Sequence, residues 1–254
     1  MQNFVAILAA GKGSRMRLSQ PKQFEMLNGK TILEHSVDTF EKHPLIHGIY
    51  VVVHEDFIEN TRRLLYVRNR PKIIDIIAGG EERMDSSFAA ISAINDFIGT
   101  GYEVRGTGFN FVEPFGVSQN TPRTSHLAPR TINLLIHDAA RPFVSEKIIT
   151  RTVEALKNHS AVSVAIPATD TIYLCNNENK IESSPKREHV YHAQTPQAAR
   201  LSIFREAFEL AKNDNQHTAT DDATVILNYL PNEKIHIVLG DVTNKKITFQ
   251  SDLN

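Results

Sequence analysis

Apolar residues occur along this chain in two alternating patterns. Short continuous apolar runs are bounded by turn-forming residues, and in the longer segments between them apolar residues recur at helical spacing. The continuous runs predict buried strands, and the longer segments predict amphipathic helices. Five runs are predicted as strands: residues 4–8, 49–53, 73–77, 132–136 and 161–166.

The predicted helices carry capping signals as well as apolar faces. Thr31 and Glu34 form a capping box, and Ser145 can cap a later helix. The apolar faces consist of Leu33, Val37 and Phe40 in one helix and of Phe88, Ile91 and Ile94 in another. Because strands alternate with helices, we predict an α/β fold with a Rossmann-like, mostly parallel sheet flanked by helices.

In such a sheet, the turns after the carboxyl ends of the strands meet at one crevice. Three of these turns contain Gly11, Gly80 and Asp138. These residues are far apart in the sequence, yet they are predicted to face a single site.

Composition narrows the class of protein. With 254 residues, of which 41% are hydrophobic, the chain can bury a full core as a single domain, residues 1–254. A net charge of −1 argues against a general nucleic-acid binder, and no apolar run is long enough to span a bilayer. The N-terminus enters the first strand without a signal peptide, and the single cysteine, Cys175, has no internal partner. We therefore expect a cytoplasmic protein.

The segment FVAILAAGKGSRMRLSQPKQF, residues 4–24, joins a buried strand to a glycine loop and to well-spaced cations. Gly11 and Gly13 allow backbone N–H groups to approach phosphate oxygens closely, and Arg15 and Lys22 supply positive charge. Neither the Walker pattern nor the complete G-x-G-x-x-G fingerprint is present. The segment predicts a polyphosphate-binding loop; the alternative is a glycine turn with surface cations.

This segment is similar to the signature of the sugar-phosphate nucleotidylyltransferases. Its PKQF ending resembles the cytidylyltransferase branch that includes 2-C-methyl-D-erythritol 4-phosphate cytidylyltransferase. The resemblance implies CTP contacts from Ala9, Ala10, Gly11 and Gly13. It also implies that Arg15, Lys22 and Lys246 act on the transferring phosphate.

A second similarity to this family is HDAARPFV, residues 137–144. The resemblance places Asp138 beside the metal and the acceptor phosphate, and Arg141 beside the acceptor. A carboxylate at a strand end suits Mg²⁺, which is usually held by few carboxylates together with substrate phosphates. The alternative is that Asp138 caps the following turn and Arg141 makes a surface ion pair.

The third similarity is GGEERMDS, residues 79–86, which in the family reads the cytosine base. The positions carried over are Gly80, Glu81 and Ser86. The family more often has Asp where this chain has Glu81. The alternative reading is a helix start with Ser86 as its N-cap.

Residues 168–194 are predicted to form a β-arm, a hairpin with the polar tip NNENK. In the family such an arm crosses to a second subunit and completes its acceptor pocket, which implies a homodimer here. Thr171, Arg187 and Thr195 would then bind the acceptor, and an Arg fork matches phosphate geometry. The alternative is an exposed hairpin with ordinary surface charge.

Near the C-terminus, residues 220–227 resemble a capped helix start of the family, with a mostly structural role. In DVTNKKITF, Lys246 matches the lysine that reaches the α-phosphate. Alternation along a strand would turn the neighbouring Lys245 to the opposite face, into solvent.

The resemblance breaks at residues 100–131, where the family has a short link. This long segment without clear periodicity is predicted to be an inserted surface loop at the edge of the sheet opposite the site. The chain also ends at Asn254, where family members usually continue into a closing helix.

The resemblance favours transfer of a cytidylyl group from CTP to 2-C-methyl-D-erythritol 4-phosphate, with Mg²⁺ as cofactor. Ribitol 5-phosphate is the alternative acceptor, because Tyr191 stands where the methylerythritol enzymes often have tryptophan. An NAD-binding dehydrogenase is the alternative from another class, and the incomplete glycine fingerprint argues against it.

Overall fold

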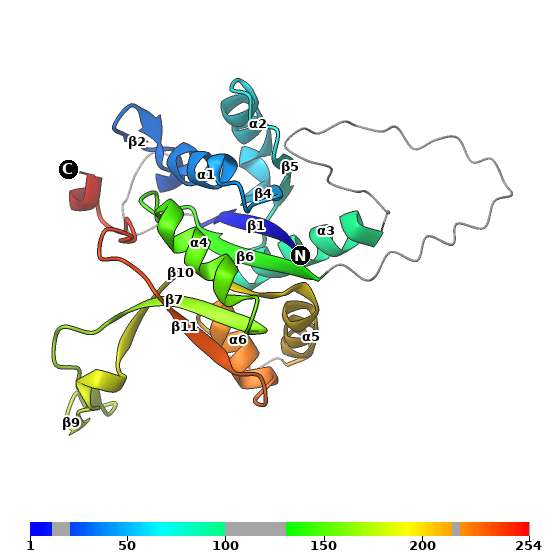
Figure 1. The fold of residues 1–254 in the computed structure, drawn as a ribbon. Coiled ribbons are helices and arrows are strands. Elements are labelled where there is room, and N and C mark those ends of the chain that lie inside the picture. The colour runs from blue at the N-terminus through cyan, green and yellow to red at the C-terminus, as the bar shows by residue number, and fades with distance from the viewer. Residues whose placement is uncertain (12–20, 100–130, 215–218, 254) are drawn as a thin grey trace, which may run out of the picture.

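The computed structural model describes residues 1–11, 21–99, 131–214 and 219–253 (Figure 1). Gly13, Arg15 and nearly all of the predicted insertion lie outside these residues. The predictions for them are therefore neither confirmed nor contradicted by the structure.

A seven-stranded sheet forms the centre of the molecule, in the order β11-β7-β10-β6-β1-β4-β5. Its strands are β1 (Gln2–Ala9), β4 (Gly48–Val53), β5 (Ile73–Ala78), β6 (Ile132–Asp138), β7 (Ala161–Pro167), β10 (Tyr191–Arg200) and β11 (Ile235–Leu239). β10 runs antiparallel to β6 and β7, and all other neighbours are parallel. The predicted mostly parallel α/β fold is confirmed.

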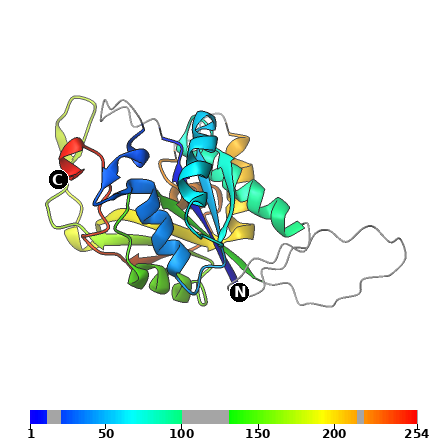
Figure 2. The same ribbon diagram turned by 90° about the horizontal axis from the view of Figure 1, so that it is seen from above.

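Helices cover both faces of this sheet, which gives three layers (Figures 1 and 2). One face packs against α1 (Ile32–Lys42), α2 (Ile58–Tyr66) and α4 (Glu146–Ala155), and the other against α3 (Arg83–Gly99), α5 (Leu201–Lys212) and α6 (Asp222–Tyr229). Side chains of β1 alternate between two apolar cores: Val5, Ile7 and Ala9 on one face, Phe4, Ala6 and Leu8 on the other. Burial on both faces explains the continuous apolar sequence of this strand.

Two of the predicted caps are present. The Thr31 hydroxyl accepts from Glu34 N–H while the Glu34 carboxylate accepts from Thr31 N–H, and Ser145 accepts from Ile148 N–H. The alternative that made Ser86 an N-cap is wrong, because α3 begins at Arg83 and Ser86 lies inside its first turns. The carboxylate of Asp85 instead accepts from Glu82 N–H at 3.0 Å.

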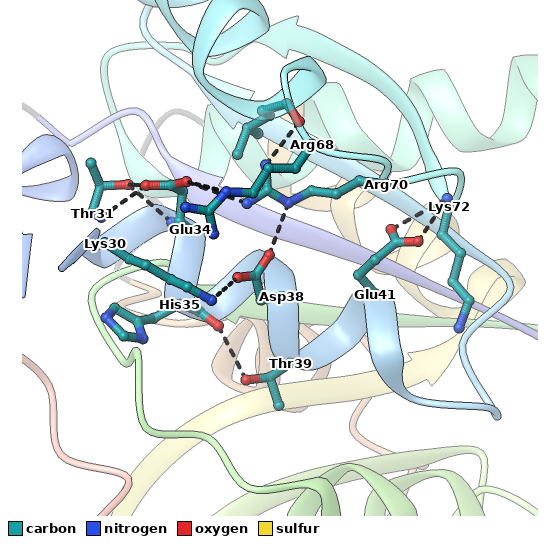
Figure 3. Close-up of polar contacts among 11 residues, drawn as sticks. Lys30, Thr31, Glu34, His35, Asp38, Thr39, Glu41, Arg68, Arg70 and Lys72 are labelled. Atoms are coloured by element: carbon teal, nitrogen blue, oxygen red, sulfur yellow. Dashed lines mark hydrogen bonds and ion pairs between the residues drawn. The ribbon is translucent and has the colours of Figure 1, made fainter. Parts of the chain in front are cut away.

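Ion pairs tie α1 to the connection between α2 and β5 (Figure 3). The Arg70 side chain is almost fully buried; its Nε donates to Asp38 at 2.9 Å, and its Nη2 approaches Glu34 at 3.4 Å. Nη1 of the same guanidinium donates to the carbonyl of Leu65 at 2.8 Å. These contacts fix α1, the helix against which the segment carrying Lys22 packs.

A small hairpin, β2 (Met26–Leu27) and β3 (Lys30–Thr31), follows the 3₁₀ turn η2 (Lys22–Phe24). Its two-residue turn, Asn28 and Gly29, has φ of 49° and 82°, the left-handed geometry typical of tight hairpins. Leu27 and Ile32 pack with the fully buried Ile247. The hairpin therefore joins the beginning of the chain to its C-terminal segment, which ends in the 3₁₀ turn η5 (Gln250–Leu253).

The segment between β7 and β10 projects from the body, on the side toward which β1 runs (Figures 1 and 2). It contains the short antiparallel pair β8 (Leu174–Cys175) and β9 (Ile181–Ser183), then the 3₁₀ turn η4 (Arg187–His189). The return of the arm differs from the prediction, because residues 191–194 are already part of β10 in the central sheet. This part of the strand was not predicted, because its polar residues form no continuous apolar run.

The C-terminal end of the predicted insertion, Thr131, lies at the amino edge of the sheet. Gln2 N–H donates to the carbonyl of Thr131 at 3.0 Å, and Gln2 pairs with Ile132 where β1 and β6 begin. The 3₁₀ turn η3 (Glu55–Phe57) follows β4 at the opposite, carboxyl edge.

Candidate active site

The carboxyl ends of β1 and β6 and the loop after β5 surround a cavity of about 400 Å³. This size is typical of a site for a small-molecule ligand. Residues that line it are Ala9, Ala10, Gly11, Lys22, Gln23, Gly80, Glu81, Glu82, Arg83, Ser86, Asp138, Thr220, Lys246 and Thr248. The loops at Gly11, Gly80 and Asp138 therefore meet, as the strand pattern predicted.

The loop after β5 packs closely against the end of β1 and the start of α3, and two glycines permit these approaches. A Cβ on Gly79 would lie 2.5 Å from the Ser86 hydroxyl and 2.7 Å from the Ala10 methyl, and one on Gly80 would lie 2.2 Å from the Cβ of Asp85. A side chain at Gly79 would force the loop away from the end of β1, and one at Gly80 would collide with Asp85 in the first turn of α3. Close packing rather than an unusual φ is the reason for glycine here.

Lys22 and Lys246 bring two ammonium groups to the cavity from opposite ends of the chain. Lys22 Nζ donates to the carbonyl of Ile247 at 2.8 Å, and Lys246 Nζ donates to Asp138 Oδ2 at 2.7 Å. Residues 245–248 form no strand, but the side-chain directions agree with the prediction: Lys246 lines the cavity, and Lys245 is exposed and does not.

Asp138 ends β6 between two cations. Arg83 Nε donates to its Oδ1 at 3.2 Å, opposite the Lys246 contact at Oδ2. Burial alone would raise the pKa of Asp138, but Arg83, Lys246 and Arg141 outweigh burial and hold this pKa well below its usual value. The carboxylate is therefore ionised throughout the neutral range and presents a fixed negative charge to the cavity.

Behind Asp138, a buried chain of hydrogen bonds fixes the backbone. His137 Nε2 lies 3.2 Å from the carbonyl oxygen of Arg141, which can only accept, so Nε2 carries the ring hydrogen. Nδ1 then accepts from the Thr195 hydroxyl at 2.9 Å, and the same hydroxyl oxygen accepts from Asp138 N–H at 3.1 Å. This chain requires a neutral His137, and burial accordingly lowers its pKa to about 4.

Acid should destabilise the fold through His137. On unfolding, its pKa returns to near 6.5, so between pH 6.5 and 4 the unfolded chain binds a proton that the folded chain does not. The contribution of neutral His137 to the free energy of unfolding is complete above pH 6.5. At pH 4.5 this contribution has fallen by about 2 kcal/mol. Urea unfolding at pH 7.5 and 4.5 checks this against His137→Gln, which cannot titrate. The gap in unfolding free energy between wild type and variant should shrink at the lower pH, and equal gaps would contradict the assignment.

Three of the five residues predicted to bind the acceptor, Asp138, Arg141 and Thr195, lie in different structural settings. Asp138 lines the cavity, whereas Arg141 donates to the carbonyls of Asn244 and Ala193 at 2.8 and 3.1 Å. Thr195 is 4% exposed and its hydroxyl is used within the protein. Both Arg141 and Thr195 are placed to support the cavity wall rather than to line it.

Thr171 and Arg187 lie on the exposed arm, where Arg187 Nη2 donates to the Thr171 hydroxyl at 3.3 Å. Neither residue lines the cavity of its own chain. Thr171 and Arg187, both predicted to bind the acceptor substrate, therefore contact each other but lie away from Asp138.

Several residues at the site had no role assigned from sequence. Gln23 donates to the carbonyl of Ala9, and Arg83 forms ion pairs with Asp138 and with the buried Asp222. Thr220 and Thr248 also line the cavity. Arg83 and Asp222 lie in segments already singled out by sequence, but only the fold places them beside one another.

Among the residues that line the cavity, three carry carboxylates: Glu81, Glu82 and, at the end of β6, Asp138. Within the described part of the chain, no group of three or more His, Cys, Asp or Glu side chains could hold a metal ion. Mg²⁺ needs no such group, because it keeps several waters and is commonly held by one or two carboxylates and the substrate's phosphates. Asp138 fits this mode of binding.

No helix in the part of the chain that the structure describes has the length and apolar character needed to cross a membrane.

Comparison with protein families identifies relatives over most of the chain. The profile of the IspD family, described as 2-C-methyl-D-erythritol 4-phosphate cytidylyltransferase, matches residues 4–98 and 125–254. The enzyme of that name from Thermobifida fusca is 34% identical over 252 residues, which cover 98% of this chain and 89% of the relative.

A second relative has a different name. The bifunctional ribulose 5-phosphate reductase/CDP-ribitol pyrophosphorylase Bcs1 of Haemophilus influenzae is 35% identical over 253 residues, which cover 99% of this chain and 47% of Bcs1. The chain therefore spans about half the length of this relative.

Solved structures give the same fold. The 4-diphosphocytidyl-2C-methyl-D-erythritol synthase from Anaerococcus prevotii aligns with a TM-score of 0.75 and 25% identity, covering 99% of this chain and 94% of that one. The 2-C-methyl-D-erythritol 4-phosphate cytidylyltransferase of Francisella tularensis aligns with a TM-score of 0.72 and 28% identity, covering 100% and 97%.

Proposed function

Because the chain belongs to the 2-C-methyl-D-erythritol 4-phosphate cytidylyltransferase family, we propose that it transfers the cytidylyl group of CTP to that polyol phosphate, releasing pyrophosphate. The observation that carries the proposal is the meeting of Lys22, Asp138 and Lys246 at one cavity. These residues supply opposite charges at the point where three strand ends converge. Family membership makes the protein a nucleotidyltransferase rather than the NAD-binding dehydrogenase considered from sequence.

In the proposed reaction, an oxygen of the acceptor phosphate forms a bond to the α-phosphorus of CTP. The bond from that phosphorus to the oxygen bridging the α and β phosphates breaks, and pyrophosphate carries away the electron pair. The attacking phosphate is already ionised near neutral pH, so no protein base is needed. Catalysis then consists of holding two anions in line and stabilising the charge of the transition state.

The cavity residues divide this work. Lys22 and Lys246 face the phosphates, and backbone N–H groups at Ala9, Ala10 and Gly11 surround them. The sequence resemblance adds Arg15 and Gly13, which lie outside the described residues. Gly80, Glu81 and Ser86 read the cytosine. Mg²⁺, when bound, would neutralise phosphate charge, and Asp138 is the residue that would hold it.

The arm supports a homodimer as the active form. Thr171 and Arg187 are exposed and absent from the cavity of their own chain. A polyol phosphate needs a cation besides Lys22 and Lys246, which are assigned to the phosphates of CTP, and Arg141 is engaged with backbone carbonyls. Arg187 of a second copy would supply this cation if each arm reaches the neighbouring site.

Mixing two inactive variants tests this arrangement. Arg187→Ala subunits retain Lys22, and Lys22→Ala subunits retain Arg187, so one of the two sites in a mixed dimer contains both residues. Mixed samples should recover up to about half of the wild-type activity per mixed dimer, whereas each variant alone stays inactive. Pyrophosphate release after unfolding and refolding the variants together measures the recovery. A monomer with full activity would refute the proposal.

Ribitol 5-phosphate is a second candidate acceptor, because the Haemophilus influenzae relative is named a CDP-ribitol pyrophosphorylase. The two acceptors differ in carbon chain but not in the attacking phosphate. Pyrophosphate release with CTP and each acceptor, compared as kcat/KM, decides between them. We expect the larger value for 2-C-methyl-D-erythritol 4-phosphate; a reversed ratio would assign the ribitol activity, and no release with either would refute cytidylyl transfer.

We also place the protein in the cytoplasm. Cys175 is a free, exposed thiol, which suits a reducing compartment.

A further inference from the structure

Asp222 is a buried carboxylate beside the cavity that the proposed reaction does not use. It is the first residue of α6, it is 1% exposed, and it does not line the cavity. Removing a carboxylate from water is costly unless opposite charge and hydrogen bonds compensate it. The partners of this buried carboxylate therefore indicate its role.

Two contacts hold the Asp222 side chain. The Ser87 hydroxyl, itself fully buried in α3, donates to Oδ1 at 2.6 Å, and Nη2 of Arg83 lies 2.6 Å from Oδ2. The same guanidinium donates through Nε to Asp138 at 3.2 Å. Arg83 thus bridges a carboxylate that faces the cavity and one that is shut off from it.

This bridge holds a cation that lines the cavity. The Arg83 side chain is 27% exposed there, so a bound triphosphate would compete with the two carboxylates for its guanidinium. Asp222 cannot follow, because Ser87 and the start of α6 hold it. Burial alone would lower the pKa of Arg83, but Asp222 and then Asp138 outweigh burial and raise it, so the cation remains charged.

We propose that Asp222 is a positioning residue: it holds the guanidinium of Arg83 against Asp138 and so fixes the carboxylate that faces the two substrates. Its effect on turnover rests on the proposed cytidylyl transfer, whereas its effect on Arg83 does not. Loss of the Asp222 charge would free Arg83 to leave Asp138 for the phosphates.

Asp222→Asn removes the charge and leaves the shape. The amide oxygen can face Arg83 while its NH₂ group donates to Ser87, whose hydroxyl can turn to a carbonyl of the preceding helical turn. We expect kcat to fall by about ten- to a hundredfold, as when a residue that orients a metal-binding group is removed. KM for CTP should stay within about threefold, because Arg83 remains available to the phosphates. A purely structural role would reduce the folded fraction without this split between kcat and KM.

Asp221→Asn is the matched control, since it makes the same change one residue away. Asp221 caps α6 and contacts Gln197 and Thr224 but not Arg83. Its kcat should stay near that of wild type. In the background of Arg83→Gln, the Asp222→Asn change should have no further effect on kcat, because the residue it acts through is gone. If Asp222→Asn alone fails to fold, kcat of Arg83→Gln is compared with kcat of the double variant, which lacks both buried charges. The two values should be equal.

A spectroscopic measurement tests the bridge without any reaction. In wild type the Arg83 Nε–H is bonded to Asp138, so its NMR signal should exchange slowly with water. In Asp222→Asn this exchange should become at least about tenfold faster, while Asp221→Asn leaves it unchanged. Unchanged exchange in Asp222→Asn, normal kcat in that variant, or a further loss of kcat in the double variant would each overturn the proposal. Absence of pyrophosphate release in wild type would refute the proposed function, and the exchange measurement would still decide the role of Asp222.

Discussion

Replacing Lys246 with Ala should lower kcat by about a hundredfold or more, the order of loss seen when a preorganised donor to the transition state is removed. The ammonium group of Lys246 lies 2.7 Å from the Asp138 carboxylate at the cavity. The segment that carries Lys246 is neither helix nor strand. Developing negative charge at the transferring phosphate would find no substitute at this position. Pyrophosphate release at saturating CTP measures the effect.

The chain contains its own control for this experiment. Lys245→Ala removes the same charge from the adjacent residue, which is exposed and does not line the cavity, so kcat should change less than about twofold. Equal losses from the two variants would indicate a general effect of charge. Near-normal turnover in Lys246→Ala would remove this lysine from the mechanism.

Asp138→Asn should abolish turnover more completely, with a loss of about a thousandfold in kcat. The variant loses the carboxylate that would hold Mg²⁺, and it leaves Lys246 and Arg83 without their shared partner at the cavity. The hydrogen bond from its backbone N–H to Thr195 remains, so the end of β6 should keep its place.

Binding of CTP separates this chemical role from a general collapse of the site. In the presence of EDTA, CTP should bind the Asp138→Asn variant at least as tightly as wild type, because a negative charge facing the phosphates has been removed. With Mg²⁺ present, the gain in affinity that the metal gives to wild type should be reduced. Titration calorimetry under both conditions measures these changes, and an equal metal effect in the two proteins would contradict the assignment of Asp138.

The parts of the fold that sequence predicted are those encoded by local signals. Continuous apolar runs gave five strands of the sheet, and capping residues such as Thr31 and Ser145 marked helix starts. β10 was not predicted, because it contains polar residues such as Gln194, Thr195 and Gln197. Their hydrogen-bond partners lie far along the chain, and no local sequence pattern indicates them. The carboxyl-end rule for parallel strands brought the separate loops to one place.

At the site, too, local motifs predicted some residues, and contacts between distant residues could not be predicted. Motif positions identified Lys22, Asp138 and Lys246, which the structure gathers at one cavity. Motifs could not reveal that Arg141 and Thr195 turn toward the protein's own backbone and side chains, because these partners come from residues far along the chain. Nor could they reveal the link from Arg83 to Asp222, which depends on how α3 packs beside α6.

The contact between Lys22 and Ile247 completes the cavity with a segment that lies outside the central sheet. The two residues are separated by 225 positions, and the last strand of the sheet, β11, ends before Lys246 is reached. The strands of the central sheet can therefore pair without the segment that carries Lys246. The fold and the proposed phosphate site thus depend on different parts of the chain.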